Sequence, residues 1–127
     1  MTAFLKFFFH FAILFLIIIS LFPGSLLGLF FYGDISQQPN LVENPFGTTL
    51  NHFLYYFFVS LLGFLIYLKK DNFKKLAFGM FFLSIALEAF HLIIPNRSFQ
   101  FGDLIGNILG VLLAYFLVKI YLYFIKL

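Results

Sequence analysis

Four long apolar runs constrain the fold of this chain more than any other feature of its sequence. They cover residues 4–22, 49–68, 76–94 and 103–125. At a rise of about 1.5 Å per residue, a helix over each run would be about 28–35 Å long, and the hydrocarbon core of a bilayer is about 30 Å thick. Strands that cross a membrane are shorter and alternate polar with apolar residues, unlike these runs. We therefore predict an all-α fold, in which residues 1–127 form a single domain, a bundle of four transmembrane helices.

The composition agrees with an integral membrane protein. Hydrophobic residues make up 63% of the chain and charged residues only 10%, whereas a soluble domain carries about 25% charged residues. The first run follows Lys6 and resembles a signal peptide, but it is longer than a usual signal core and no small-residue cleavage site follows it. We interpret it as the first span. The absence of cysteine excludes disulfides, thiolate nucleophiles and cysteine-based metal sites.

The lysines predict the orientation of the bundle. The connection KKDNFKK, residues 69–75, carries four of the seven lysines, and lysines concentrate in cytoplasmic loops. With four spans, both termini then lie in the cytoplasm, on the side where Lys6, Lys119 and Lys126 also fall. Arg97 and four of the five acidic residues lie toward the outside. The net charge of +3 therefore reflects topology, and we expect no nucleic acid partner.

Local signals predict where the helices begin and end. Pro23 and Gly24 end the first helix, and Thr48 and Thr49 offer N-cap oxygens to the second. Residues 24–48 form the only long loop. Pro95 is expected to end the third helix, because the residue before a proline is disfavoured in the α region. Asp103 is expected to be the N-cap of the fourth helix.

Polar residues gather at the predicted outer end of the bundle. Between residues 88 and 107 the chain reads EAFHLIIPNRSFQFGDLIGN, in an otherwise apolar context. The polar side chains of this stretch include Glu88, His91, Arg97, Asp103 and Asn107. The short loop 96–102 makes the third and fourth helices antiparallel neighbours, and His52 enters from the same side at the start of the second helix.

Helical spacing places these residues on stripes that can face one another. Ser84, Glu88, His91 and Pro95 recur at i, i+4, i+7 and i+11, on one face of the third helix. The stripe on the fourth helix consists of Asp103, Gly106, Asn107 and Gly110, and the stripe on the second consists of His52, Tyr56, Ser60 and Gly63. The glycines at 102, 106 and 110 would let a neighbouring backbone approach closely.

These stripes predict a polar pocket at the outer surface. A charge that faces lipid at depth costs several kcal/mol, so such groups turn inward and pair. Arg97 is the only fixed positive charge on this side, and its planar fork can hold two carboxylates. We therefore expect Arg97 to pair with Glu88 and Asp103. His91, His52 and Asn107 would edge this cluster.

The same residues resemble the motif of the VanZ-like membrane protein family. The motif is a Glu, a polar residue that is usually Gln, a Pro-x-Arg, an Asp and an Asn-x-x-Gly at fixed spacing. Its members here are Glu88, His91, Pro95, Arg97, Asp103, Asn107 and Gly110. SLFPGS after the first helix and NHFLYYFFVSLLGF in the second are also similar to the family. Two departures are His91 in place of Gln, and Thr48-Thr49 where the family often has Asp-Lys.

The resemblance implies a multi-pass protein of the bacterial inner membrane, with a role in envelope-lipid or cell-wall physiology. The founding member of the family is linked to resistance to the glycopeptide teicoplanin, so the resemblance also implies a role in glycopeptide tolerance. The residues themselves leave three functions open. In the first, the cluster binds an anionic headgroup of a membrane lipid, with Arg97 as the donor beside the N-terminus of the fourth helix.

In the second, the chain is a small membrane enzyme that acts on a lipid-linked phosphate. Glu88, His91 or His52 would then be the catalytic general base or proton carrier. In the third, the polar residues only lock the helix ends together, in a structural subunit without a ligand.

A metal site is a further possibility that the residues disfavour. Glu88-x-x-His91 is the half-motif found in metal sites of helical bundles. Such sites need more ligands, and only His52 and Asp103 are at hand. Arg97, expected in the same cluster, would repel a divalent cation. We therefore expect neither a metal nor a cofactor.

Overall fold

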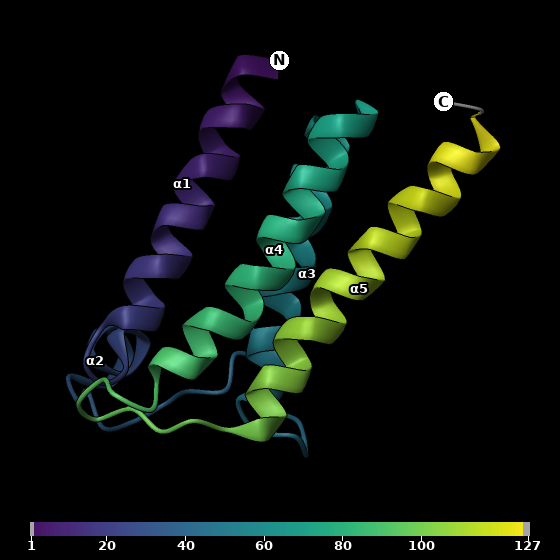
Figure 1. Cartoon of the computed structure of the whole chain (residues 1–127). Helices are drawn as coiled ribbons and strands as arrows, with labels where there is room; N and C mark the ends of the chain where they lie inside the picture. The colour runs from purple at the N-terminus through teal and green to yellow at the C-terminus, as the bar shows by residue number, and fades with distance from the viewer. Residues whose placement is uncertain (1, 126–127) are drawn as a thin grey trace.

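The computed structural model describes residues 2–125, and within this range it contains five helices and no strand. The helices are α1 (Thr2–Leu21), α2 (Leu26–Tyr32), α3 (Thr49–Ile66), α4 (Lys70–Phe90) and α5 (Phe101–Phe124). The four long helices run in alternating directions, and α2 lies at one end of the bundle (Figure 1). The prediction of an all-α fold is confirmed. Lys126, which we counted with the cytoplasmic lysines, lies outside the described residues.

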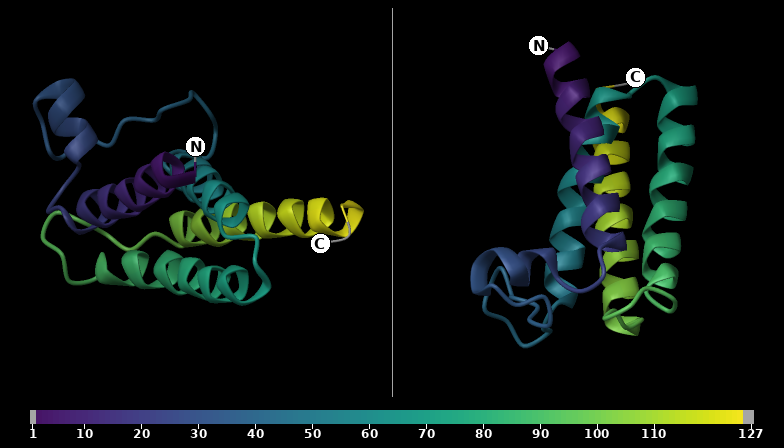
Figure 2. Two further views of the ribbon diagram at one scale, coloured as in Figure 1. Left: turned by 90° about the horizontal axis from the view of Figure 1, so that it is seen from above. Right: turned by 90° about the vertical axis from the view of Figure 1, so that its left-hand side faces the viewer.

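The path of the chain divides the bundle into two ends. The start of α1, the connection between α3 and α4 and the last turn of α5 lie at one end (Figures 1 and 2). The opposite end carries α2, the loop that follows it and the connection between α4 and α5. This second end is called the α2 end below, and the first is called the lysine end because residues 69–75 lie there.

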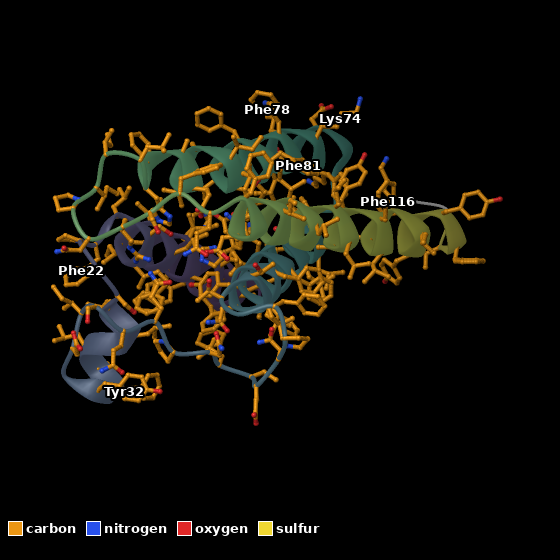
Figure 3. The ribbon with its side chains drawn as sticks, turned by 90° about the horizontal axis from the view of Figure 1, so that it is seen from below. Phe22, Tyr32, Lys74, Phe78, Phe81 and Phe116 are labelled. Carbon is orange, nitrogen blue, oxygen red and sulfur yellow. The ribbon has the colours of Figure 1, made fainter. Side chains whose placement is uncertain are left out.

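Three helices of the described chain are long and apolar enough to cross a membrane. They are Ala3–Leu21 in α1, Thr49–Ile66 (α3) and Phe101–Phe124 (α5). The fourth long helix, α4, contains more charge, because Lys74, Lys75 and Glu88 all fall within it. It nevertheless presents an apolar outer face on which Phe78 is 76% exposed (Figure 3). An exposed apolar face of this kind indicates an apolar environment.

The most extensive helix–helix contact joins α3 to α5, and two glycines allow it. A Cβ on Gly106 would lie 2.6 Å from the carbonyl oxygen of Thr49, and a Cβ on Gly110 would lie 2.5 Å from the carbonyl oxygen of Phe53. Real Cβ atoms do not approach a backbone so closely. The predicted glycine stripe is thus the face on which α5 packs against the backbone of α3.

An apolar core fills the bundle between these helices. Its most deeply buried members are Tyr56, Phe64, Val111, Ala114 and Val118. Helix α1 joins this core through Phe9 and Leu16. It is also linked to α3 by the Tyr55 hydroxyl, which donates to the carbonyl oxygen of Ala12 at 2.9 Å.

The expectation that residues 24–48 form only a loop was wrong, because they contain α2. Ser25 is its N-cap, and its side-chain oxygen accepts a hydrogen bond from the amide of Gly28 at 2.9 Å. Gly33 ends the helix with a left-handed conformation, φ 68°, which glycine adopts without a steric penalty. An N-cap serine before an apolar stretch is the sequence signal that we overlooked.

Two predicted helix boundaries were also wrong. Helix α4 begins at Lys70 rather than at residue 76, and it ends at Phe90 rather than near Pro95. Residues 91–94 continue in tight turns, in which the amide of His91 donates to the carbonyl oxygen of Glu88 at 3.1 Å. The proline therefore follows a turn and not the helix itself.

Asp103 was expected to be the N-cap of the last helix, but that position belongs to Gln100. Asp103 lies within the first helical turn, and its carboxylate accepts hydrogen bonds from threonine hydroxyls of the neighbouring segment. Thr48 is the N-cap residue of α3, as expected, but its side chain forms no cap hydrogen bond. Its hydroxyl donates to Asp103 instead.

Candidate functional site

Buried polar side chains converge at the α2 end of the bundle. Glu88 is 1% exposed and Asp103 is 3% exposed, and the side chain of His52 is 23% exposed. Helix α3 supplies His52, α4 supplies Glu88, and α5 supplies Asp103 and Asn107. His91 is the C-cap residue of α4. The sequence correctly predicted that these side chains would lie together.

His52 lies between the two carboxylates. Its Nε2 is 3.4 Å from Asp103 Oδ2, and its Nδ1 is 4.0 Å from Glu88 Oε2. The same Nδ1 lies 2.9 Å from Asn107 Oδ1. The Asn107 amide donates in turn to the carbonyl oxygen of Ser84 at 3.1 Å. His52 thus connects polar groups of three helices.

Glu88 is bound through only one of its oxygens. Oε1 accepts a hydrogen bond from the backbone amide of Gln100 at 3.0 Å. Oε2 lies 3.2 Å from His91 Nδ1, but it is buried and accepts no hydrogen bond from any described residue. The other nitrogen of His91, Nε2, is 3.1 Å from the carbonyl oxygen of Ser20 on α1.

The carboxylate of Asp103 accepts hydrogen bonds from Thr48, the N-cap residue of α3, and from Thr49, the first residue of α3. The Thr48 hydroxyl is 3.1 Å from both carboxylate oxygens, and the Thr49 hydroxyl is 3.3 Å from Oδ1. These threonines stand where the resemblance places an Asp-Lys pair. In this chain they hold the carboxylate with neutral donors.

The predicted pairing of Arg97 with Glu88 and Asp103 was wrong. Within the described chain, Arg97 forms no ion pair within 4.0 Å. Its Nε donates to the carbonyl oxygen of Phe22 at 3.2 Å, and a second N–H donates to the carbonyl oxygen of Ile19. The physical reason is that the last carbonyls of a helix lack partners within the helix, and α1 ends beside this loop.

The two carboxylates still act on Arg97 through space. Burial lowers the pKa of the Arg97 guanidinium, while the negative charges of Glu88 and Asp103 act in the opposite direction. The guanidinium thus remains near the carboxylates without contacting them. Its N–H groups bind the end of α1 instead.

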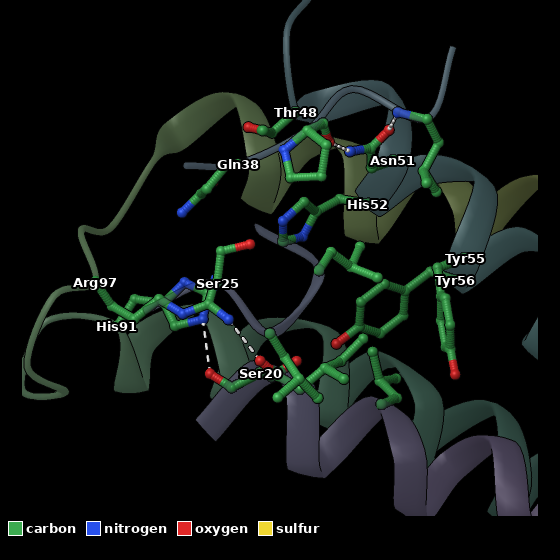
Figure 4. A pocket seen from close by; sticks show the side chains of 16 residues that line it. Ser20, Ser25, Gln38, Thr48, Asn51, His52, Tyr55, Tyr56, His91 and Arg97 are labelled. Atoms are coloured by element: carbon green, nitrogen blue, oxygen red, sulfur yellow. Dashed lines mark hydrogen bonds between the residues drawn. The ribbon is translucent and has the colours of Figure 1, made fainter. Parts of the chain in front are cut away.

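A pocket of about 100 Å³ adjoins this cluster (Figure 4). The end of α1, helix α2, residues 38–41 and the start of α3 surround it. Its polar lining includes Ser20, Ser25, Gln38, Thr48, Asn51, His52, His91 and Arg97, and its apolar lining includes Leu16, Leu26 and Leu27. Glu88 and Asp103 are not among the described residues that line it. The pocket therefore presents imidazole and guanidinium groups rather than carboxylates.

Part of the pocket wall could not be predicted from the sequence. Asn51 holds residues 38–41 in place, because its amide donates to the carbonyl oxygen of Pro39 at 2.8 Å and its oxygen accepts from the amide of Leu41 at 3.0 Å. Both partners are backbone groups, which no residue type marks in a sequence. Ser25 was the one member with a visible signal, as the N-cap of α2.

The fold and the site together define a helical membrane protein with buried titratable groups beside a pocket at one end. The family model described as VanZ/LLP1 matches residues 7–123, nearly the whole chain. The protein therefore belongs to the VanZ/LLP1 family, as the motif between Glu88 and Gly110 indicated. No curated protein and no solved structure matches the chain.

Proposed function

We propose that this VanZ/LLP1-family protein crosses the bacterial inner membrane four times, with both termini in the cytoplasm. The three apolar helices support this, and so does α4, which runs antiparallel to α5 and exposes Phe78. The start of α1 and the last turn of α5 lie at the lysine end, which the distribution of lysines assigns to the cytoplasm. The α2 end, with the pocket, then faces outward.

At this outer face the pocket binds the anionic headgroup of a membrane lipid. The position of Arg97 is the observation that carries this proposal. The carbonyl oxygens of Ile19 in α1 and of Phe22 just after it hold the guanidinium at the pocket wall, and a guanidinium has more N–H donors than two carbonyls use. The remaining donors suit the planar oxygens of a phosphate.

The rest of the lining fits a lipid. Leu16, Leu26 and Leu27 offer an apolar surface to the first part of an acyl chain. His52 and His91 separate a bound anion from the carboxylates behind them, which would repel it. Headgroup binding at this position connects the protein to envelope-lipid and cell-wall physiology, and through them to glycopeptide tolerance.

Lipid retention tests the proposal. Full-length protein is solubilised in a mild detergent, and the lipids that copurify are identified by mass spectrometry. We expect wild type to retain anionic lipid and Arg97→Ala to lose most of it. Lys74→Ala is the matched control, because it removes the same charge from an exposed position at the lysine end. Identical lipid profiles for wild type and Arg97→Ala would contradict a headgroup pocket.

One observation favours catalysis as a second candidate function. His52 lines the pocket, and its Nδ1 lies 2.9 Å from Asn107 Oδ1, which can only accept a hydrogen bond. The imidazole is thus oriented with its lone pair on Nε2, the form that a general base requires. The chain would then act on a lipid-linked phosphate. Turnover of such a lipid by the purified protein, abolished in Glu88→Gln and His52→Gln, would favour the enzyme. Retention without turnover would favour the binding protein.

A further inference from the structure

The two buried carboxylates, Glu88 and Asp103, both lie close to His52. Glu88 Oε2 is 4.0 Å from His52 Nδ1, and Asp103 Oδ2 is 3.4 Å from His52 Nε2. Both oxygens of Asp103 accept from threonine hydroxyls, whereas Glu88 Oε1 accepts from the Gln100 amide and Glu88 Oε2 accepts from no described residue. Three helices thus each supply one potential ligand atom, and these atoms lie within 4.8 Å of one another.

The hydrogen bonds around His52 determine which nitrogen carries its proton. The carbonyl oxygen of Ser84 can only accept, so the Asn107 amide nitrogen faces it and Asn107 Oδ1 faces His52. Oδ1 also only accepts, and His52 Nδ1 must therefore be the protonated nitrogen. In the neutral imidazole, the lone pair is then on Nε2. That lone pair lies 3.4 Å from Asp103 Oδ2.

His91 repeats the arrangement on the other carboxylate. Its Nε2 lies 3.1 Å from the carbonyl oxygen of Ser20, which can only accept, so Nε2 is protonated. The neutral ring then directs the Nδ1 lone pair toward Glu88 Oε2, 3.2 Å away. This oxygen is the one that is buried without a hydrogen bond from the described residues. An acceptor that faces another acceptor in a buried site needs either an added proton or a metal ion between or beside them.

We propose that His52 Nε2, Glu88 Oε2 and Asp103 Oδ2 bind one divalent transition-metal ion. One ligand atom from each residue already lies within 4.8 Å of the other two. An ion that binds nitrogen and oxygen at about 2.0–2.2 Å would draw the three side chains inward by about an ångström. The charge of the ion would neutralise the two carboxylates, which are otherwise costly to bury.

The surrounding groups match what such a site requires. A metal-bound histidine donates its other N–H to an oxygen that fixes its orientation, as His52 Nδ1 does to Asn107. Ligating carboxylates are themselves hydrogen-bonded, as Asp103 is by the threonines and Glu88 by Gln100. His52 is the ligand that lines the pocket, so a further coordination position next to it can be reached from there.

The sequence disfavoured a metal ion partly because Arg97 was expected to pair with both carboxylates. In that position the guanidinium would repel a cation. Arg97 instead binds the carbonyl oxygens of Ile19 and Phe22 at the end of α1 and just after it. One imidazole and two carboxylates suit a borderline ion such as Zn²⁺ or Mn²⁺. The inference goes beyond headgroup binding and does not depend on it.

Metal analysis of the full-length protein tests this inference. Protein purified in detergent is stripped with a chelator, dialysed against Zn²⁺ and measured by inductively coupled plasma mass spectrometry. We expect one zinc per chain for wild type, and less than a tenth of that for Asp103→Asn and Glu88→Gln. Asp71→Asn is the matched control, because it removes an exposed carboxylate at the lysine end, outside the cluster, and should keep the full zinc content.

A second variant separates a metal site from a folding defect. Asn107→Ala removes the partner that orients His52 but no ligand, and loss of such a partner lowers metal affinity by about 10–100-fold. Competition with a coloured chelator measures this affinity, and the elution volume in size-exclusion chromatography shows that the variant is folded. Wild-type protein that binds neither Zn²⁺ nor Mn²⁺ at unit stoichiometry would overturn the inference. It would mean that two protonated imidazoles neutralise the carboxylates instead.

Discussion

Arg97 Nε donates a hydrogen bond to the carbonyl oxygen of Phe22 over 3.2 Å, and this bond ties the loop after α4 to the end of α1. A second N–H of the same guanidinium binds the carbonyl oxygen of Ile19. The end of α1 is thereby fixed beside the polar cluster. Since α1 forms one wall of the pocket, Arg97 both shapes the pocket and lines it.

Arg97→Lys should therefore destabilise the protein although it keeps the charge. An ammonium lacks the planar fork that reaches two carbonyls at once, so at least one charged hydrogen bond is lost. Such bonds are worth about 1.5–3 kcal/mol, and the free energy of unfolding should fall by about this amount. Thermal unfolding in detergent measures it. The exposed control Lys74→Ala should stay within about 0.5 kcal/mol of wild type; equal stability of all three proteins would show that the α1 carbonyls do not need Arg97.

The sequence predicted the four long helices because length and apolarity are properties of each segment alone. It also predicted that His52, Glu88, Asp103 and Asn107 meet, since helical periodicity assigns each to a stripe and a short loop makes the stripes face each other. The helices and the meeting of these side chains follow from local spacing and from the general rules for burial. They do not depend on the exact path of the backbone.

The partners of Arg97 could not be predicted in this way. We paired it with the carboxylates because they are the only opposite charges nearby in the sequence. Its actual partners are backbone carbonyls of Ile19 and Phe22, and every residue has a carbonyl. Only the packing of α1 shows which ones lie within reach. The partners of Asn51, which are backbone groups of residues 39 and 41, could not be predicted for the same reason.

Gly110→Ala should weaken the contact between α3 and α5. The new Cβ would lie 2.5 Å from the carbonyl oxygen of Phe53 and 2.8 Å from the amide nitrogen of Phe57. Both are backbone atoms, so the helices must separate, and overpacking of this kind costs about 1–3 kcal/mol. Thermal unfolding of the purified variant in detergent measures the loss.

Gly79→Ala is the matched control for that substitution. Gly79 also lies within a helix, α4, but no described atom lies within 4 Å of the position that its Cβ would take. Alanine is favoured over glycine inside a helix by about 0.5–1 kcal/mol, and this variant should be slightly more stable than wild type. If both alanines behaved alike, the close approach at Gly110 would not be a packing constraint.

Cysteine labelling should reveal the orientation in the membrane. The chain has no natural cysteine, so a single introduced thiol gives an unambiguous signal. Glu43 and Asp71 are both exposed and lie at opposite ends of the bundle. We expect a membrane-impermeant maleimide to label Glu43→Cys in cells whose outer membrane is permeabilised and whose inner membrane is intact.

The companion variant Asp71→Cys lies in the lysine-rich connection. It should react only after the inner membrane is opened, because the lysines hold that connection in the cytoplasm. The reverse pattern would mean that the pocket faces the cytoplasm. Labelling of both positions in intact cells would contradict a fixed topology.

His91→Gln should be tolerated, whereas His91→Leu should not. Nε2 of His91 lies 3.1 Å from the carbonyl oxygen of Ser20, and a glutamine amide can donate to the same oxygen. The resemblance to the VanZ-like pattern also places glutamine here. Leucine would leave that carbonyl without its partner and Glu88 Oε2 beside a purely apolar group. An unsatisfied buried polar group costs about 1–3 kcal/mol, which thermal unfolding in detergent should detect.

Glutamine substitutions of the two histidines separate the role of His91 from that of His52. His91 is not one of the three proposed metal ligands, so His91→Gln should retain one zinc per chain while His52→Gln loses it. A histidine whose role is to join α4 to α1 would lose stability when replaced by leucine and keep the metal when replaced by glutamine. Loss of zinc in both glutamine variants would instead make His91 a fourth ligand, drawn toward the ion together with the Glu88 oxygen that lies 3.2 Å from its Nδ1.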